Sequence, residues 1–283
     1  MRSIRNFFVF FISGLTIFYT SCLDSQKNNQ NIVDNKVHII ANDAGYEYPD
    51  CILAGMSHII FENHGSEIHE VMFVKLSEGM TGKNYLDEVA SGISFPEGAI
   101  DYSGPGLVSS GGKVEMWLTL DPGNYLLACW FKGHLETLKP YTMTVLKSGK
   151  KGITPPKEDV TLKMIDFRFE LDGILKKGDQ VIKVETVGPT MHEVDFFRLH
   201  DGKTIEDIRQ WQKQGKNGQP PGTAIGGILD NHDISRIVWL KTNFEPGRYV
   251  LWCGMAMVPD SNEPGFDVTH ADAGMFKELL IQD

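Results

Sequence analysis

The sequence predicts an all-β protein made of two tandem Greek-key β-sandwich domains, each with one short helix. Three observations support this fold class: a unit that occurs twice, many short segments with strand composition, and one helical segment in each copy. Many short strands separated by turns are typical of sandwiches. At 283 residues the chain has room for two ordinary domains, each with its own core.

The repeat is visible in two pairs of matching segments. "HEVMFVKLSEG", which starts at His69, corresponds to "HEVDFFRLHDG", which starts at His192. "LDPGNYLLAC", which ends at Cys129, corresponds to "FEPGRYVLWC", which ends at Cys253. The spacing from histidine to cysteine is 60 residues in the first copy and 61 in the second. Such agreement indicates a duplicated structural unit.

The repeat sets the expected domain boundaries. The first repeat is domain 1 at 37–147, and the second repeat is domain 2 at 159–283. Between them, residues 148–158 have the Lys, Gly and Pro content of a linker.

The N-terminus predicts a lipoprotein signal peptide at residues 1–22. Two arginines precede an apolar run, Phe7 to Phe18, and small residues lead to Cys22. This run is too short to span a bilayer comfortably. We expect Cys22 to carry the lipid and residues 23–36 to form a flexible tether. A plain signal peptide with an unrelated cysteine is the alternative.

Strand signals dominate both repeats. Val114 to Leu120 alternates apolar with other residues, and "HIIFEN", "HEVMFV" and "QVIKVET" are short and rich in β-branched or aromatic residues. One segment in the second repeat, Thr204 to Trp211, has apolar residues at helical spacing and a capping pattern. Tyr85 to Val89 predicts a shorter helix in the first repeat. The Gly- and Pro-rich stretch Gly218 to Gly227 is interpreted as a connecting loop.

The second repeat carries four residues in the order of a metal-ligand set. His192 is followed, after a long gap, by Cys253, His270 and Met275. A thiolate, two imidazoles and a weak thioether hold copper in an electron-transfer geometry. The alternative is a buried core cysteine beside an unrelated loop histidine.

On these residues each repeat resembles a cupredoxin, the fold of plastocyanin and azurin. Gly123, Tyr125 and Cys129 form the "G-x-Y-x-x-x-C" strand end, as do the corresponding residues before Cys253. The resemblance implies a type 1 copper site at His192, Cys253, His270 and Met275, with one copper ion or two in the chain. The segment between Cys253 and His270 is longer than in small plastocyanins. It contains Met255 and Met257, which compete with Met275 as the axial sulfur.

The first repeat has a partial ligand set. His69, Cys129 and His134 are present, but the position that corresponds to Met275 is Lys139. Met143 lies four positions further on, in the expected last strand. Both a three-ligand copper site and an eroded site retained as packing remain open.

Charge and cysteine content restrict the function classes. The net charge of −10 argues against a nucleic-acid partner. Cys51, Cys129 and Cys253 are an odd number of thiols for an oxidising compartment, and metal ligation of Cys129 and Cys253 would explain it. Cys51 is expected to be a small buried apolar residue.

We therefore expect a non-enzymatic copper electron carrier in the cell envelope, lipid-anchored and facing the periplasm or the exterior. Its expected partners are a redox protein and, through Cys22, a membrane. A binding, structural or copper-handling lipoprotein is the first alternative. A multicopper oxidase or nitrite reductase is a second alternative, but these families carry His-x-His pairs, which do not occur among the nine histidines of this chain.

Overall fold

The computed structural model describes residues 35–93, 96–131, 134, 139–149, 152–230, 236–257 and 268–283. The predicted signal peptide and lipidated Cys22 lie outside these residues, as does nearly all of the predicted tether. Within the described part of the chain, no helix is both long enough and apolar enough to cross a membrane.

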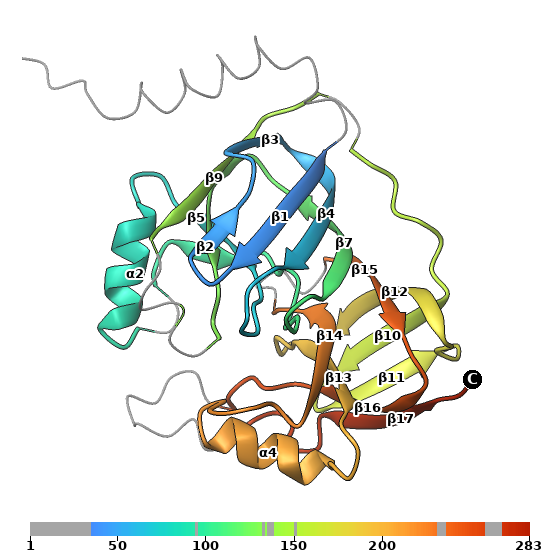
Figure 1. Cartoon of the computed structure of the whole chain (residues 1–283). Helices are drawn as coiled ribbons and strands as arrows, with labels where there is room; N and C mark the ends of the chain where they lie inside the picture. Colours follow the sequence, from blue (N-terminus) through green and yellow to red (C-terminus); the bar gives the residue numbers. More distant parts are fainter. Residues whose placement is uncertain are drawn as a thin grey trace, which may run out of the picture. The chain divides into compact units, whose positions relative to one another are not determined.

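The first repeat folds into two β-sheets (Figure 1). Its strands are β1 (Lys36–Asn42), β2 (Gly45–Glu47), β3 (Cys51–Leu53), β4 (Gly55–Asn63), β5 (Met72–Leu76), β6 (Ala99–Asp101), β7 (Lys113–Leu120), β8 (Gly123–Ala128) and β9 (Tyr141–Leu146). One sheet has the order β2-β1-β4-β7, and the other has the order β3-β9-β8-β5-β6. Alternating burial along β1 places Val37, Ile39 and Ala41 in the core.

The second repeat builds the same arrangement. Its strands are β10 (Val160–Ile165), β11 (Arg168–Asp172), β12 (Gly178–Val187), β13 (Val194–Leu199), β14 (Gly222–Ile228), β15 (Val238–Phe244), β16 (Gly247–Trp252) and β17 (Phe276–Ile281). Their orders are β11-β10-β12-β15 and β14-β13-β16-β17. These sheets confirm the predicted all-β fold class.

Each repeat has one helix whose full bounds lie in the described part of the chain. Helix α2 (Gly82–Ala90) and helix α4 (Ile205–Lys213) both have nine residues, so the first-repeat helix is longer than Tyr85 to Val89. The Asp207 carboxylate accepts the Thr204 N–H at 2.9 Å, which satisfies one free donor at the start of α4.

The two repeats share a continuous eight-stranded sheet through an antiparallel pair, β7 and β15. Met116 pairs with Leu240, and each of these residues stands 13 positions before its cysteine, Cys129 or Cys253. The two repeats are therefore related at this seam by a local two-fold axis. Trp117 pairs with Trp239 on one side of it.

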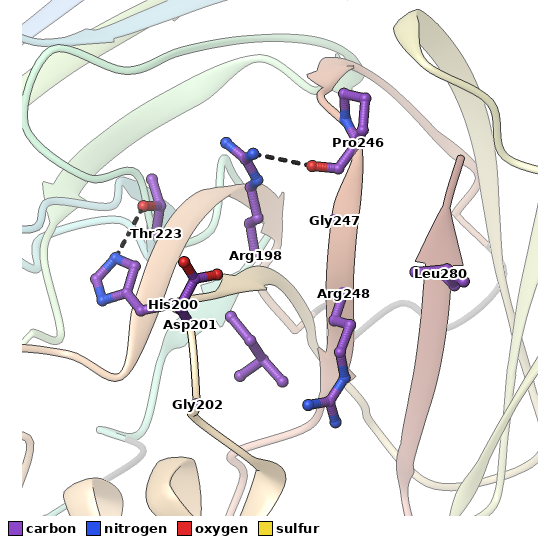
Figure 2. Close-up of a pocket in the computed structure, with 10 residues that line it drawn as sticks. Arg198, His200, Asp201, Gly202, Thr223, Pro246, Gly247, Arg248 and Leu280 are labelled. Carbon is purple, nitrogen blue, oxygen red and sulfur yellow. Dashed lines mark hydrogen bonds between the residues drawn. The ribbon is translucent and has the colours of Figure 1, made fainter. Parts of the chain in front are cut away.

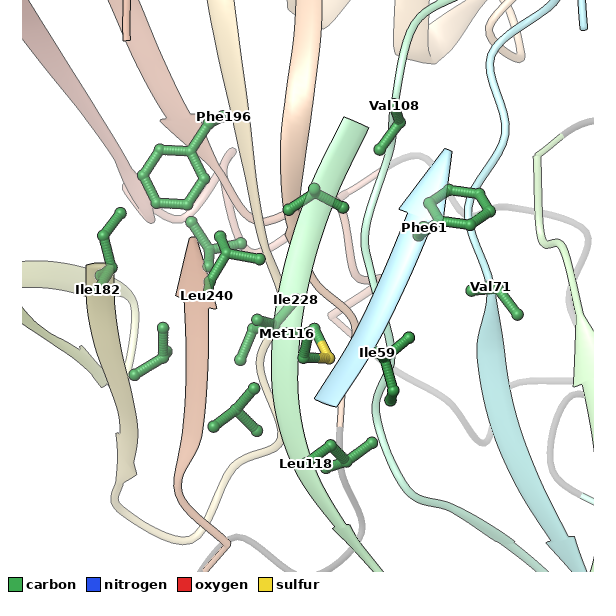
Figure 3. Close-up of a cluster of buried hydrophobic side chains, with 14 of the residues drawn as sticks. Ile59, Phe61, Val71, Val108, Met116, Leu118, Ile182, Phe196, Ile228 and Leu240 are labelled. Carbon is green, nitrogen blue, oxygen red and sulfur yellow. The ribbon is translucent and has the colours of Figure 1, made fainter. Parts of the chain in front are cut away.

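Apolar side chains from both repeats form one continuous core. Ile59, Phe61 and Met116 of the first repeat belong to the same buried cluster as Ile182 and Leu240 of the second (Figure 3). Burial of such side chains is the main contribution to stability. The core thus holds the two repeats together as well as each repeat individually.

Two details differ from the sequence-based expectations. Gly222 to Gly227 is part of β14 rather than a loop, and a Cβ at Gly227 would collide with the Val194 carbonyl of β13. Glycine at this position allows the two strand backbones to approach closely. From the sequence alone, the Gly and Pro content had indicated a connecting loop. Cys51 begins β3 and is half-buried rather than buried. Cys129 and Cys253 are free thiols.

Candidate metal centres

Two groups of histidine and cysteine side chains converge in the described part of the chain, one in each repeat. They are His69, Cys129 and His134 in the first repeat, and His192, Cys253 and His270 in the second. Within each group the three donor atoms lie within 4.8 Å of one another. The fold therefore brings together residues that are up to 78 positions apart in the sequence.

The second-repeat site is the more deeply buried of the two. Its cysteine follows the end of β16, His192 precedes β13, and His270 comes from the segment before β17. The Nδ1 atoms of His192 and His270 are 3.0 Å apart, and the Cys253 Sγ is 3.4 Å from the His270 Nδ1. One first-row metal ion with bonds of about 2 Å spans such separations. All three residues are at most 4% exposed.

Both cysteine sulfurs are surrounded by backbone donors. Cys253 Sγ accepts the N–H groups of Glu193 and Met255, and Cys129 Sγ accepts those of Glu70 and Phe131. A thiol donates one hydrogen bond, so two backbone donors directed at one sulfur favour the thiolate. Burial acts in the opposite direction and raises the pKa of Cys129 to about 12, and that of Cys253 well above its usual value. A bound cation would resolve this conflict.

The imidazoles are held in the neutral, ligand-competent form. Burial, with a smaller effect from His192, lowers the pKa of His270 to about 4. Burial and the nearby His134 lower the pKa of His69 to about 4 as well. Metal binding requires neutral imidazole, so no proton has to be displaced from these two rings at neutral pH.

Met275 is fully buried in the same apolar cluster as Cys253. Its carbonyl accepts the Cys253 N–H at 3.2 Å, and its own N–H donates to the His270 carbonyl at 2.9 Å. The predicted axial residue is thus fixed by backbone bonds to two of the ligands. Met255 and Met257 are half-buried.

The first-repeat site differs in exposure and in the atoms around it. The Cys129 Sγ is 3.3 Å from the His134 Nδ1, and the rings of His69 and His134 stack with centroids 4.5 Å apart. The Nε2 of His69 is buried without a hydrogen-bond partner. Lys139, which corresponds to Met275, is exposed, and Met143 lies within β9 as expected.

Tyr46 is a first-site residue that sequence reasoning missed. It stands in β2, and its hydroxyl donates to the Glu70 carbonyl and interacts with the Cys129 side chain. At the corresponding position the second repeat has Phe169, which has no hydroxyl group. Alignment of the two repeats would have shown a tyrosine opposite a phenylalanine, but not that the side chain reaches the cysteine.

A carboxylate behind each upstream histidine was also missed. Asp166 Oδ1 lies 3.2 Å from the His192 Nε2, and Asp43 Oδ1 lies 3.9 Å from the His69 Nε2. Asp43 and Asp166 are 123 positions apart, as are His69 and His192. Alignment of the two repeats would therefore have paired the two aspartates. A carboxylate on the outer nitrogen fixes ring orientation and raises the basicity of the ligand nitrogen.

The chemistry of both donor sets fits copper. Two imidazoles and one thiolate in a buried trigonal group, with a thioether available in the second repeat, are the donors of blue-copper sites. Such an ion would supply a one-electron couple, and the surrounding side chains would hold its ligands in place during the change of oxidation state.

A surface cavity of about 460 Å³ is lined by residues that belong to neither centre (Figure 2). Two arginines line it, but each is already engaged: Arg198 donates to Glu245 and the Pro246 carbonyl, and Arg248 donates to Glu278. We therefore assign the cavity no ligand.

Comparisons with known proteins found solved structures of low similarity. No family model matches the chain, and no curated protein matches it. The similar solved structures include an auracyanin from Roseiflexus castenholzii, with 20% identity, a TM-score of 0.31 and coverage of 40% of this chain and 97% of that one.

Auracyanin A of Chloroflexus aurantiacus has 18% identity and a TM-score of 0.30 over 40% of this chain and 98% of that one. A multicopper oxidase has 12% identity and a TM-score of 0.24 over 87% of this chain and 88% of that one. The interpretation of the two centres therefore rests on their own donor atoms.

Proposed function

We propose that this protein is a copper-binding electron carrier whose principal redox centre is formed by His192, Cys253, His270 and Met275. The observation that carries this proposal is the buried convergence of two Nδ1 atoms and one sulfur, 3.0 and 3.4 Å apart. The ligand residues are at most 4% exposed, so little room remains for a substrate to reach the ion. A closed ligand shell suits electron transfer better than catalysis on a bound substrate.

His69, Cys129 and His134 are proposed as a second copper site without a thioether. Its donor atoms are equally close, and its outer histidine nitrogen is held by Glu67, which lies 2.8 Å from the His134 Nε2. A three-ligand site is chemically sufficient for copper, since the axial ligand of such sites is weak.

The test is a copper titration of the purified protein followed by its visible spectrum. We expect up to two copper ions per chain and an intense thiolate-to-copper band. Cys253→Ala should remove the second-repeat component, and Cys129→Ala should remove the first-repeat component. A protein that stays colourless and binds no stoichiometric copper would refute the proposal. A band that depends on Cys129 alone would move the principal centre to the first repeat.

We also propose that Cys22 carries a lipid that anchors the protein in the cell envelope. The supporting feature is the sequence pattern around Cys22, with a polar stretch after it. Intact mass and detergent partitioning of the native protein test this. Cys22→Ser should abolish both the lipid mass and the partitioning. A mature protein that carries no lipid mass and stays in the aqueous phase would contradict the anchor.

A further inference from the structure

A pair of buried carboxylates links the two metal centres to each other. Glu70 directly follows His69, and Glu193 directly follows His192. The Glu193 carboxylate accepts the Gly254 N–H at 2.9 Å, and the Glu70 carboxylate accepts the Trp130 N–H. Each glutamate therefore binds the residue after its own ligand cysteine, while its backbone N–H donates to that cysteine sulfur.

Lys216 is the cation whose charge acts on both glutamates, on Glu70 in the first repeat and on Glu193 in the second. The groups that act on Lys216 in turn are Glu70, Glu193, Asp195 and the Cys129 thiol. Burial opposes its charge, but the three carboxylates outweigh burial and raise the pKa of Lys216.

The chain places this lysine by a specific local geometry. Lys216 follows α4 and has a φ of 57°, in the left-handed region that favours glycine. Its N–H donates to the Trp211 carbonyl at 2.8 Å, which fixes the turn. Gly215 and Gly218 beside it also have positive φ, so glycine is available to this turn at lower cost. Because this backbone conformation favours glycine, a lysine at this position indicates that the lysine side chain itself is needed there.

The same side chain crosses from the second repeat to the first. The Lys216 ammonium lies 5.9 Å from the centroid of the Phe131 ring, and that ring lies 5.3 Å from the ring of His134. The Phe131 N–H donates to the Cys129 sulfur. Lys216 thus contacts a residue that touches two ligands of the opposite centre.

We propose that Lys216 is a positioning residue that couples the two metal centres electrostatically and raises the reduction potential of both. This inference rests on the proposed function. Reduction of either centre takes one electron from a redox partner and lowers the charge of that centre by one, with no proton required. A cation whose charge acts on both glutamates stabilises this more negative state. The effect should be larger at the first centre, because the Lys216 ammonium lies 5.9 Å from the ring of Phe131, whose N–H donates to the Cys129 sulfur.

The experiment measures the reduction potential of each centre alone, in copper-loaded full-length protein carrying Cys253→Ser or Cys129→Ser. Lys216→Met should make reduction on the order of tenfold less favourable at the first centre, which is about 59 mV for one electron. The shift should be smaller at the second centre. Lys216→Arg should keep both potentials close to those of the unchanged chain.

Lys213→Met is the matched control, because Lys213 is exposed and is the last residue of α4, the helix that precedes Lys216. Equal potentials in Lys216→Met and Lys213→Met, with the blue bands intact, would overturn the coupling. Lys216→Gln replaces Lys216→Met should the latter fail to fold. Where only the second repeat takes up copper, the comparison is made on its potential alone. Absence of any blue band in the unchanged chain would instead refute the proposed function.

Discussion

The two centres share a ligand plan but differ in what surrounds it. In the second repeat the His192 side chain is 0% exposed, and its outer nitrogen is 3.2 Å from Asp166. In the first repeat the His69 side chain is 8% exposed, and its outer nitrogen is 3.9 Å from Asp43. The first centre has Tyr46 against its sulfur in place of an apolar ring. A duplicated fold has thus kept the three strong ligands and varied the groups that adjust them.

This comparison indicates which properties should differ between the centres. Ligand identity sets whether copper binds, whereas the axial sulfur, the outer carboxylate and hydrogen bonds to the thiolate adjust affinity and potential. The predicted axial sulfur is present only in the second repeat, and the outer carboxylate lies closer to its histidine there. A tyrosine hydroxyl next to the cysteine is present only in the first repeat. Single substitutions can therefore test them against a natural counterpart in the same chain.

The largest expected effect concerns the carboxylate behind the upstream histidine. Asp166→Ala should weaken copper binding at the second centre by about 10- to 100-fold, because His192 loses the group that fixes its orientation. Competition with a copper chelator measures this. Asp43→Ala is the counterpart, and its effect on the first centre should be only about threefold, since the Asp43 oxygen is beyond hydrogen-bond distance of His69. Equal losses at the two centres would show that the difference in distance has no functional meaning.

The axial position should produce the next largest difference. Met275→Leu removes the thioether but keeps a similar apolar volume, so the fold should tolerate it. Reduction of the second centre should become on the order of tenfold more favourable, about 59 mV, because the reduced ion needs the axial ligand least.

Lys139→Leu is the matched change in the first repeat, and it should leave that potential unchanged because Lys139 is exposed. Spectroelectrochemical titration of both variants checks the pair. An unchanged potential in Met275→Leu would assign the axial role to Met255 or Met257.

Much of the fold was readable from the sequence because the repeat doubles every signal. The matching histidine and cysteine segments located β5, β8, β13 and β16, and the capping pattern located α4. The three strong donors of each centre were also found in advance, since their residue types and order are unusual together. His134 was identified although it lies only five residues after Cys129.

Contacts across the repeats could not be predicted in this way. The pairing of Met116 with Leu240 depends on which sheet edges meet, and a strand pattern does not specify its partner. Lys216 reaches Phe131 from a segment with no counterpart signal in the first repeat. Tyr46 was missed for a related reason: its hydroxyl reaches Cys129 only after β2 folds against β1, 83 residues before the cysteine.

Tyr46 also provides the smallest and most specific test of the comparison. Tyr46→Phe gives the first repeat the apolar ring that the second repeat already has at Phe169. The single Tyr46 hydroxyl proton, which the Glu70 carbonyl accepts here, is expected to turn to the sulfur once copper holds Cys129 as a thiolate. Tyr46→Phe removes that hydrogen bond, which withdraws electron density from the thiolate, so reduction of the first centre should become less favourable. A hydrogen bond of about 1 kcal/mol corresponds to a roughly fivefold change in that equilibrium.

Tyr48→Phe is the matched control, because its hydroxyl donates to the Thr142 carbonyl at 3.1 Å and is exposed. It should leave both potentials unchanged. In Tyr46→Phe the potential of the first centre should move while that of the second stays fixed, since Tyr46 contacts Cys129 rather than Cys253. A shift of equal size at both centres would mean that Tyr46 acts through Glu70 and Glu193. Tyr46 donates to the Glu70 carbonyl, and the Glu70 carboxylate interacts with that of Glu193 in the other repeat. The Tyr46 result therefore separates tuning of one centre from coupling between two.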